Sequence, residues 1–484
     1  MLFNSFDFLI FLPIVFVLYW HVFKLKLWWQ NLFVVVASYV FYGWWNWRFL
    51  LLIAVTSLCS YSSGLLIDQQ LQRGNQRLAK LWTVMNIVVN LSILGVFKYF
   101  NFFVDSLQML FSEIGVTLDA PTLKVILPVG ISFYTFQALS YTIDVYRRQM
   151  TATKDIVAFF AFISFFPQLV AGPIERASNL LPQFLNRREF DYVNAVDGLR
   201  QMLWGLFKKL VVADNCAVAV NFIWGSYTDQ SGLALWVAAF LFTFQIYCDF
   251  SGYSDIAIGC ARLFGIRLRR NFDVPYFSRN IQEFWRRWHI SLMTWFRDYA
   301  YFPLGGSREG RWLTVRNILI VFFLSGLWHG ADWTFVLWGL YHGVLLSALT
   351  FIPHKRYKDV VAESRMCPRL QELVQIGLTF AFVLVGWIIF RAENVTQLGS
   401  IAAKLFTAEG FFNLYGSGLR PDIFVFIGFM LIVEWLQRGK QHALQFPAVS
   451  VFRYRFVRVG IYYFLLILMW VSYSSAQEFI YFQF

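Results

Sequence analysis

The run LVQIGLTFAFVLVGWIIF, residues Leu373–Phe390, contains no charged side chain. A helix crosses a bilayer with roughly 20 largely apolar residues, so this run predicts a transmembrane helix. The fold class predicted is an all-α polytopic membrane protein with about ten or eleven transmembrane helices, some of them tilted or broken. Similar apolar runs, several shorter than a full span, occur at Phe8–Trp20, Leu32–Trp45, Phe49–Ile67, Leu81–Val96, Val125–Val145, Leu233–Cys248, Asn317–Trp328, Trp333–Ile352, Ile423–Val433 and Val459–Ala476.

The composition agrees with a membrane protein. Of the 484 residues, 58% are hydrophobic and 14% are charged, and the mean hydropathy is +0.54, which is too apolar for a soluble globular chain. The net charge is +13, and the Lys and Arg residues lie in loops between spans, as the positive-inside rule predicts. No nucleic-acid partner is therefore expected. Met1–Asp7 lacks Lys and Arg, so the first run is expected to be a retained helix. Without any linker, we expect a single integral membrane domain over residues 1–484.

Three segments are apolar yet interrupted. Tyr99–Ile114 and Tyr192–Val212 carry scattered charges and predict amphipathic helices lying along the interface. Phe165–Arg176 contains Pro167 and Pro173, which argue against one straight helix. Because irregular backbone at membrane depth is tolerated only against protein or a wet cavity, this third segment is expected to line a chamber.

Two histidines are the first candidates for chemistry. His289 ends the stretch Phe-Trp-Arg-Arg-Trp-His, and His329 lies in Ser-Gly-Leu-Trp-His-Gly, between Gly326 and Gly330. A titratable ring is costly to place in a bilayer, and histidine takes and returns a proton near neutral pH. Glycines at this spacing allow a helix break or the close approach of another backbone. The alternative for His329 is a buried ring satisfied by a neighbouring carbonyl, and the alternative for His289 is a ring that only caps a helix or forms a hydrogen bond.

Arginines are dense between Arg262 and Arg316. If Glu283–Tyr301 forms one helix, Arg286 and Arg297 project within about 20° of each other, and His289 lies about 60° from Arg286. Such a basic stripe with one histidine suits a polar groove that holds an anionic ligand. The alternative is that the arginines snorkel to lipid phosphates.

Further polar residues lie near these segments. Asp249 and Asp255 end the apolar run in Tyr247–Asp255, Gln168 lies in the interrupted Phe165–Arg176, and Trp328 precedes His329. These four are candidates to orient a histidine or to line a tunnel. Asp255 has the alternative of pairing with an arginine, and a structural role is favoured for it.

Familiar soluble-enzyme motifs are missing from the sequence. No nucleotide-binding glycine loop, Gly-x-Ser-x-Gly elbow or His-Glu-x-x-His motif occurs, so an acyl-serine of the hydrolase type is not expected. The five cysteines are scattered without a Cys-x-x-Cys pair, so neither a disulfide framework nor a metal site is expected.

Longer motifs carry a resemblance. Glu283–Gly306 and Gly326-Leu-Trp-His-Gly-Ala resemble the membrane-bound O-acyltransferase family, and its bacterial alginate O-acetyltransferase branch most of all. Segments throughout the chain agree with that branch: Ala37–Tyr42, Leu127–Gln137, Phe166–Pro173, Asp249–Asp255 and Tyr481–Phe484. The resemblance implies helices around a central tunnel, with the acyl donor entering from the cytoplasm and the acceptor from outside.

The family's site residues map onto this sequence. Its near-invariant histidine matches His329, which is expected to act as general base, and its second polar position matches His289, expected to orient the acyl group or to polarise its carbonyl. Transient acylation of His329, or of a partner's nucleophile, is an open alternative. No bound cofactor is expected, and acetyl-CoA is the expected donor. Our own inference is that its phosphates contact Arg267, Arg269, Arg270, Arg286 and Arg287, with snorkelling as an equal alternative.

The resemblance also implies a setting. We expect a multi-pass protein of a bacterial inner membrane that passes acetyl groups to periplasmic acetyltransferase subunits of the SGNH-hydrolase type and finally to an exported polysaccharide. One alternative is D-alanyl or other acyl transfer from a carrier-protein thioester to a cell-wall polymer. The others are non-enzymatic: a channel or flippase for polysaccharide or lipid, or a scaffold for a synthase complex.

Overall fold

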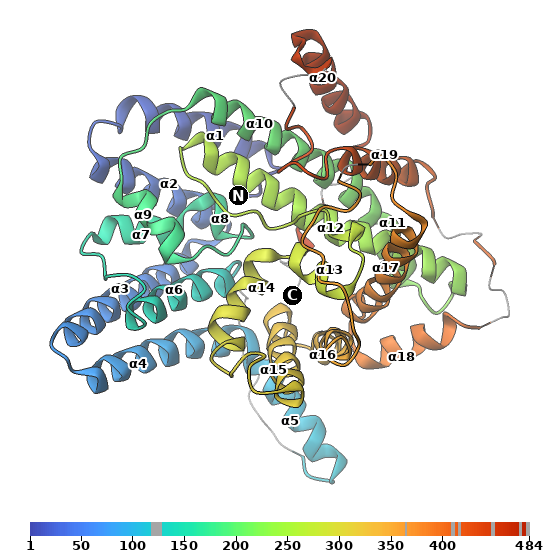
Figure 1. Cartoon of the computed structure of the whole chain (residues 1–484), viewed down its shortest axis with the longest axis horizontal. Helices are drawn as coiled ribbons and strands as arrows, with labels where there is room; N and C mark the ends of the chain where they lie inside the picture. Colours follow the sequence, from blue (N-terminus) through green and yellow to red (C-terminus); the bar gives the residue numbers. More distant parts are fainter. Residues whose placement is uncertain are drawn as a thin grey trace. The chain divides into compact units, whose positions relative to one another are not determined.

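The computed structural model describes residues 1–117, 128–363, 365–407, 412–414, 418–446, 451–473 and 477–480. All regular secondary structure in these ranges is helical, which confirms the predicted all-α class (Figure 1). The start of the run Val125–Val145, the end of the run Val459–Ala476 and the motif Tyr481–Phe484 lie outside the described residues.

Most residues of the predicted apolar runs lie on helices, and the described non-helical residues are at the ends of three runs: 128–130, 349–352 and 472–473. Five helical stretches in the described ranges are long and apolar enough to cross a membrane, and two shorter apolar helices, Phe6–Val22 and Trp333–Ala348, accompany them. The five are Leu27–Gln72, Gln76–Glu113, Gly232–Leu263, Arg311–His329 and Leu370–Arg391. The first combines two predicted runs, and the second combines the run Leu81–Val96 with the predicted amphipathic segment Tyr99–Ile114. The expected total of ten or eleven spans stays a prediction.

The chain forms two compact units, and the single domain expected for it stays a prediction. The first comprises Met1–Ala195 and Cys260–Arg269, and the second Val196–Gly259 and Arg270–Phe484. The helices of the first unit are α1 (Phe6–Val17), η1 (Leu18–Val22), α2 (Leu27–Asn46), η2 (Trp47–Phe49), α3 (Leu50–Gln72), α4 (Gln76–Leu94), η3 (Gly95–Tyr99), α5 (Phe100–Glu113), α6 (Ile131–Tyr146), α7 (Ile156–Ser164), α8 (Phe166–Leu169) and α9 (Ala177–Leu185).

Polar side chains join the helices of the first unit. The Asn86 amide on α4 donates to Ser60 of α3 at 3.2 Å and accepts from Thr142 of α6 at 2.8 Å, and these three helices pack together (Figure 1). Such bonds between apolar helices fix their register. The predicted interruption after Ser164 is confirmed, because α7 ends there and only the single turn α8 precedes the irregular stretch to Arg176.

The second unit carries both candidate histidines. Two helices, α10 (Tyr192–Phe207) and α12 (Gly232–Leu263), contribute residues to both units. The predicted amphipathic segments are helical, as α5 and as α10 with η4. The other elements of the second unit are η4 (Lys208–Ala213), α11 (Asp214–Gly225), η5 (Pro275–Phe277), α13 (Ile281–Arg287), α14 (Ile290–Phe296), η6 (Arg297–Tyr301), α15 (Arg311–His329), α16 (Trp333–Ala348), α17 (Leu370–Arg391), α18 (Val395–Lys404), α19 (Asp422–Leu436), η7 (Val451–Arg453) and α20 (Arg455–Val471).

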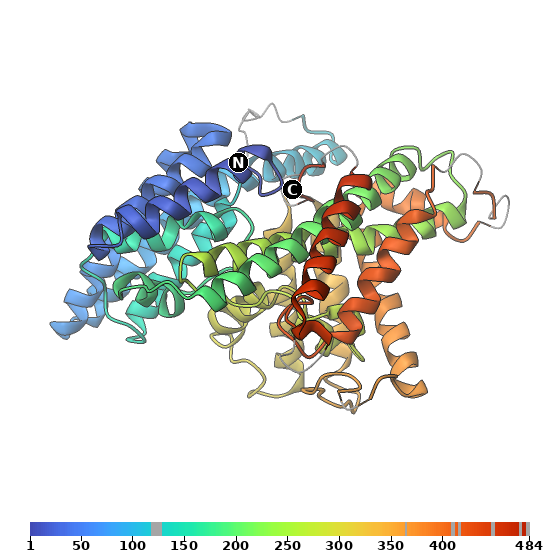
Figure 2. The same ribbon diagram turned by 90° about the horizontal axis from the view of Figure 1, so that it is seen from above.

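Aromatic and aliphatic packing holds the second unit together. Its core cluster includes Trp224 of α11, Leu235 of α12 and Ile388 of α17, all buried. Phe429 of α19 packs on Phe464 of α20, with ring centroids 5.7 Å apart, and these two red helices lie beside each other in Figure 2.

The helices α15 and α16 cross at very short range. A Cβ atom on Gly326 would lie 2.3 Å from the carbonyl oxygen of Phe335, and one on Gly339 would lie 2.2 Å from that of Phe322. Small residues let two membrane helices bring their backbones together in this way. The crossing therefore fixes the end of α15, where His329 lies.

We expect Gly339→Ala to lower the free energy of unfolding by about 1–3 kcal/mol, because the added methyl group forces the two backbones apart. The matched control is Gly377→Ala on α17, where a Cβ atom meets nothing within 4 Å. Alanine there is expected to be neutral or stabilising by about 0.5–1 kcal/mol. Chemical denaturation of the detergent-solubilised protein measures both, and equal effects would contradict the prediction.

Candidate active site

His329 is the last residue of α15. The following Gly330 is extended, with φ −159° and ψ 155°, so the helix ends directly after the histidine. The imidazole is 4% exposed and packs against Trp328, Trp338 of α16 and Phe390 of α17, with ring centroids 5.0, 4.8 and 5.6 Å away. Three helices therefore place this ring in an aromatic enclosure.

His289 lies at a backbone break, and the prediction of one helix over Glu283–Tyr301 is wrong. Helix α13 ends at Arg287, Trp288 is extended, and His289 takes the left-handed conformation with φ 44° and ψ 51°. The break is stabilised from outside the helix, since the Ile290 amide donates to the Asn271 carbonyl at 2.9 Å. The Asp273 amide donates to the Arg287 carbonyl, also at 2.9 Å.

The structure brings the two histidine rings together. Their centroids are 6.3 Å apart, and Trp328 lies beside both, 5.7 Å from His289. On its other side His289 packs on Phe250 of α12 at 4.7 Å. Two imidazoles, one at the end of α15 and one at the break between α13 and α14, thus share one buried, aromatic environment.

A hydrogen bond holds the His289 ring. Its Nδ1 lies 3.2 Å from Oδ1 of Asn271, a residue that the sequence analysis did not single out. His289 lies between α13 and α14, outside the five long apolar helices, and burial lowers its pKa to about 3. Its imidazole is therefore neutral at physiological pH.

The two predicted carboxylates do not contact either histidine through any hydrogen bond or ion pair that the structure gives them. Asp255 pairs with Lys208 at 2.7 Å, and Asp249 pairs with Lys209 at 2.8 Å. The structural alternative for Asp255 is thus the one observed, with a lysine in place of an arginine. Gln168 belongs to the first unit, where its amide donates to Gln137 at 3.0 Å.

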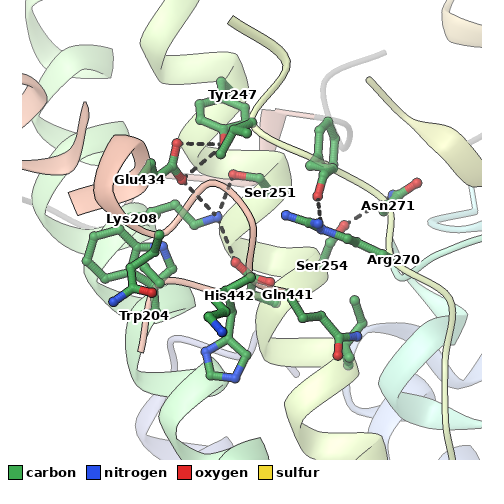
Figure 3. A pocket seen from close by; sticks show the side chains of 17 residues that line it. Trp204, Lys208, Tyr247, Ser251, Ser254, Arg270, Asn271, Glu434, Gln441 and His442 are labelled. Carbon is green, nitrogen blue, oxygen red and sulfur yellow. Dashed lines mark hydrogen bonds and ion pairs between the residues drawn. The ribbon is translucent and has the colours of Figure 1, made fainter. Parts of the chain in front are cut away.

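A polar cavity lies among α12, η4, α19 and the segment that begins at Arg270. Its volume is about 440 Å³, including the space at its opening to solvent. Figure 3 shows the Lys208 ammonium among carboxylate and hydroxyl oxygens: besides Asp255 it lies 2.9 Å from Ser251 and 4.0 Å from Glu434. Asn271 also lines this cavity.

The sequence analysis missed Lys208, Glu434 and Asn271. The first two carry a usable signal, because a lysine pair inside an apolar stretch and a lone glutamate at the end of an apolar helix both suggest buried ion pairs. Asn271 carries none, since asparagine is common in loops and its partner is set by the fold.

The arginines proposed to hold phosphate have different surroundings. Arg287 is buried and pairs with Glu283 at 3.0 Å and Asp273 at 2.8 Å, while Arg270 pairs with Asp273 at 2.7 Å. Arg286 is exposed. The remaining two belong to the first unit: Arg267 is exposed, and the Nε of Arg269 lies 4.0 Å from Glu175.

A second, larger cavity is strongly basic. Its space, open to solvent, is about 2550 Å³, and α13, α14 and α15, the elements that flank both histidines, contribute to its wall. Arg286 and Arg297 both line it, so the predicted basic groove exists although the helix is broken. The five arginines of the wall are Arg286, Arg297, Arg308, Arg311 and Arg356.

We expect Arg287→Met to lower the free energy of unfolding by about 3–5 kcal/mol, because it removes one partner from a buried ion-pair network. The neighbouring Arg286→Met is the matched control, expected to change it by no more than about 0.5 kcal/mol because Arg286 is exposed. Denaturant titration of both purified variants makes the comparison, and an equal loss in both would contradict a structural role of Arg287.

Comparison with known proteins gives consistent matches. The sequence model of the membrane-bound O-acyltransferase family matches residues 40–389, a range that includes His289 and His329. The probable alginate O-acetylase of Pseudomonas aeruginosa is 43% identical over 366 residues, 76% of this chain and 68% of that protein. The peptidoglycan O-acetyltransferase of Helicobacter pylori is 37% identical over 391 residues, 75% and 71% respectively. The teichoic acid D-alanyltransferase of Bacillus subtilis is 28% identical over 278 residues, which are 55% of this chain and 69% of that protein.

Proposed function

This chain belongs to the membrane-bound O-acyltransferase family and is a multi-pass membrane acyltransferase, and we propose that it O-acetylates an exported polysaccharide. The names of the relatives support this proposal, because proteins at 43% and 37% identity are called alginate and peptidoglycan O-acetylating enzymes. The observation that carries the proposal is the pair of histidine rings, 6.3 Å apart, on elements that also contribute to the wall of the arginine-lined cavity.

The donor is acetyl-CoA, held in the arginine-lined cavity. Arg311, Thr314, Ile318 and Phe322 line it along one face of α15. Arg311 and His329 are 18 residues apart, which is about five turns, so they project from the same face with about 27 Å of axis between them. A long thioester whose phosphates bind arginines at the mouth thus has a continuous helix face that leads to the histidine.

The proposed chemistry uses both rings. A neutral His329 accepts the proton of the attacking hydroxyl while its oxygen bonds to the thioester carbonyl carbon. The carbon–sulfur bond then breaks, and the thiolate leaves with the proton that His329 returns, so that an acetyl ester and a thiol are the products. His289, on the other side of the reacting groups, orients them.

The finer setting belongs to the same proposal. Lys24, Lys26 and the basic stretch 354–369 favour a cytoplasmic donor side in a bacterial inner membrane. The acyl group then passes outward to a periplasmic acetyltransferase subunit of the SGNH-hydrolase type, which acetylates the polysaccharide. The similarity to a teichoic acid D-alanyltransferase keeps carrier-protein thioesters as the second candidate donor.

We expect His329→Ala to lower acetyl transfer by about 10²–10⁴-fold, because it removes the general base. The assay supplies radiolabelled acetyl-CoA to oriented vesicles that contain the chain and its exported partner, and it counts label on the far side. His289→Ala is compared at matched expression, with the exposed His21→Ala as control. Undiminished transfer by His329→Ala would contradict the mechanism, and label accepted only from a carrier protein would favour the second candidate.

We expect Arg311→Ala to raise KM for acetyl-CoA about tenfold or more with little change in kcat, because a phosphate loses a charged hydrogen bond far from the reacting atoms. The matched control is Arg316→Ala, an exposed arginine on the same helix that does not line the cavity. Initial rates over a range of acetyl-CoA concentrations give both constants. A KM unchanged in Arg311→Ala, or raised equally in Arg316→Ala, would remove the cavity from the donor's path.

A further inference from the structure

Asn271 connects His289 to the polar cavity that Lys208 lines. The side chain is fully buried, and its Oδ1 lies 3.2 Å from Nδ1 of His289. Its Nδ2 donates to Ser254 on α12 at 3.2 Å, a bond visible in Figure 3. The amide therefore bridges the histidine and the helix that forms one wall of the cavity.

The hydrogen bonds around Asn271 settle which end of its amide faces the ring. The backbone N–H of Ser291 points at Oδ1 from 3.3 Å, and the Ser291 hydroxyl lies 2.9 Å from the same atom. A backbone N–H only donates, so the atom it meets is the amide oxygen. Since an oxygen accepts, Nδ1 of His289 must carry the proton in their shared hydrogen bond.

We propose that Asn271 is a positioning residue that locks His289 in the tautomer protonated at Nδ1, so that Nε2 meets the reacting groups with its lone pair. This inference rests on the proposed acyl transfer. In this form His289 accepts a hydrogen bond from the attacking hydroxyl and orients its oxygen toward the carbonyl carbon. Polarising the acyl carbonyl would require a proton at Nε2, and the lock opposes that role.

Most charged groups on the elements around His289 are paired with each other, whereas Arg286 on α13 is exposed and donates to the Tyr357 carbonyl. On α12, Asp249 and Asp255 bind Lys209 and Lys208. In the segment between α12 and α13, Arg270 binds Asp273. On α13, Arg287 binds Glu283 and Asp273. The titratable side chain whose ring contacts His289 is His329. Burial lowers the pKa of His289 and keeps its ring neutral, and the uncharged amide at position 271 adds no charge that would favour the imidazolium.

The test places a carboxylate where the amide is. Asn271→Asp keeps an acceptor oxygen against Nδ1 but favours the imidazolium, which raises the pKa of His289 by about 1–3 units. Activity requires the unprotonated Nε2, so the acidic limb of the kcat/KM profile moves to higher pH. Asn271→Ser, whose hydroxyl both donates and accepts, loosens the lock and lowers kcat about 10–100-fold with little change in KM.

Asn215→Asp is the matched control. Asn215 is another buried asparagine, bonded through its amide to the carbonyls of Val211 and Ser472 and not to either histidine. It is expected to alter stability while leaving the pH profile in place. A wild-type pH profile in Asn271→Asp, or the same shift in Asn215→Asp, would overturn the proposal and show that Asn271 has only a structural role.

A measurement without acyl transfer separates this inference from the proposed function. Protein labelled with ¹⁵N-histidine distinguishes Nδ1–H from Nε2–H rings by solid-state NMR, and the loss of a signal in His289→Gln assigns the ring. We expect an Nδ1–H signal in the wild type and an altered one in Asn271→Ser. An Nε2–H signal would overturn the inference even if acetyl transfer is found, and absent acetyl transfer with an Nδ1–H signal would overturn only the function.

Discussion

The backbone hydrogen bonds between residues 271–273 and the α13–α14 break are the interaction on which the second unit's site depends. They hold His289 in the left-handed region, which costs about 1–3 kcal/mol for a residue other than glycine. Without them the segment from Glu283 onward would continue as a helix, as its sequence favours. The His289 ring would then leave Asn271 and the neighbouring His329, and one wall of the basic cavity would change direction. Val274 is also left-handed, with φ 39°. The backbone strain therefore extends to the segment 271–274, whose residues form the hydrogen bonds with the break.

Buried charge is the second constraint. Each buried cation of the second unit's two ion-pair groups meets two carboxylates. Lys208 meets Asp255 and Glu434, and Lys209 meets Asp214 and Asp249. Arg279 and Arg287 share Glu283, and each also meets an aspartate, Asp359 and Asp273 respectively. Pairing of this kind is needed because a lone charge in a water-poor interior is expensive. Among the arginines of the larger cavity, Arg297 pairs with Asp298 at 2.7 Å, and the others lie at an opening where a ligand can supply the opposite charge. The separation of paired from available arginines is a property of the fold that composition does not reveal.

The sequence predicted the parts of the fold that depend on local periodicity. Apolar runs such as Leu373–Phe390 became helices, and the glycines around His329 marked a close helix crossing and a helix end. The break at His289 was not predictable, because neither Gly nor Pro lies there and the bonds that stabilise it come from residues earlier in the chain. For the same reason Asn271 was missed, whereas Lys208 and Glu434 were visible as charges inside apolar stretches. The resemblance to a family supplied the roles of the histidines, which periodicity alone left open.

The continuous face of α15 has a consequence for which sequence changes the enzyme can accept. Arg311 and His329 share that face only because about five whole turns separate them. One inserted or deleted residue between them would rotate the histidine by about 100° relative to the arginine and carry it toward lipid or a neighbouring helix. Point substitutions along the outer side of α15 leave this relation intact. The number of residues between Arg311 and His329 is therefore constrained. We expect the length of α15 to vary less among functional variants than the lengths of the loops at either end.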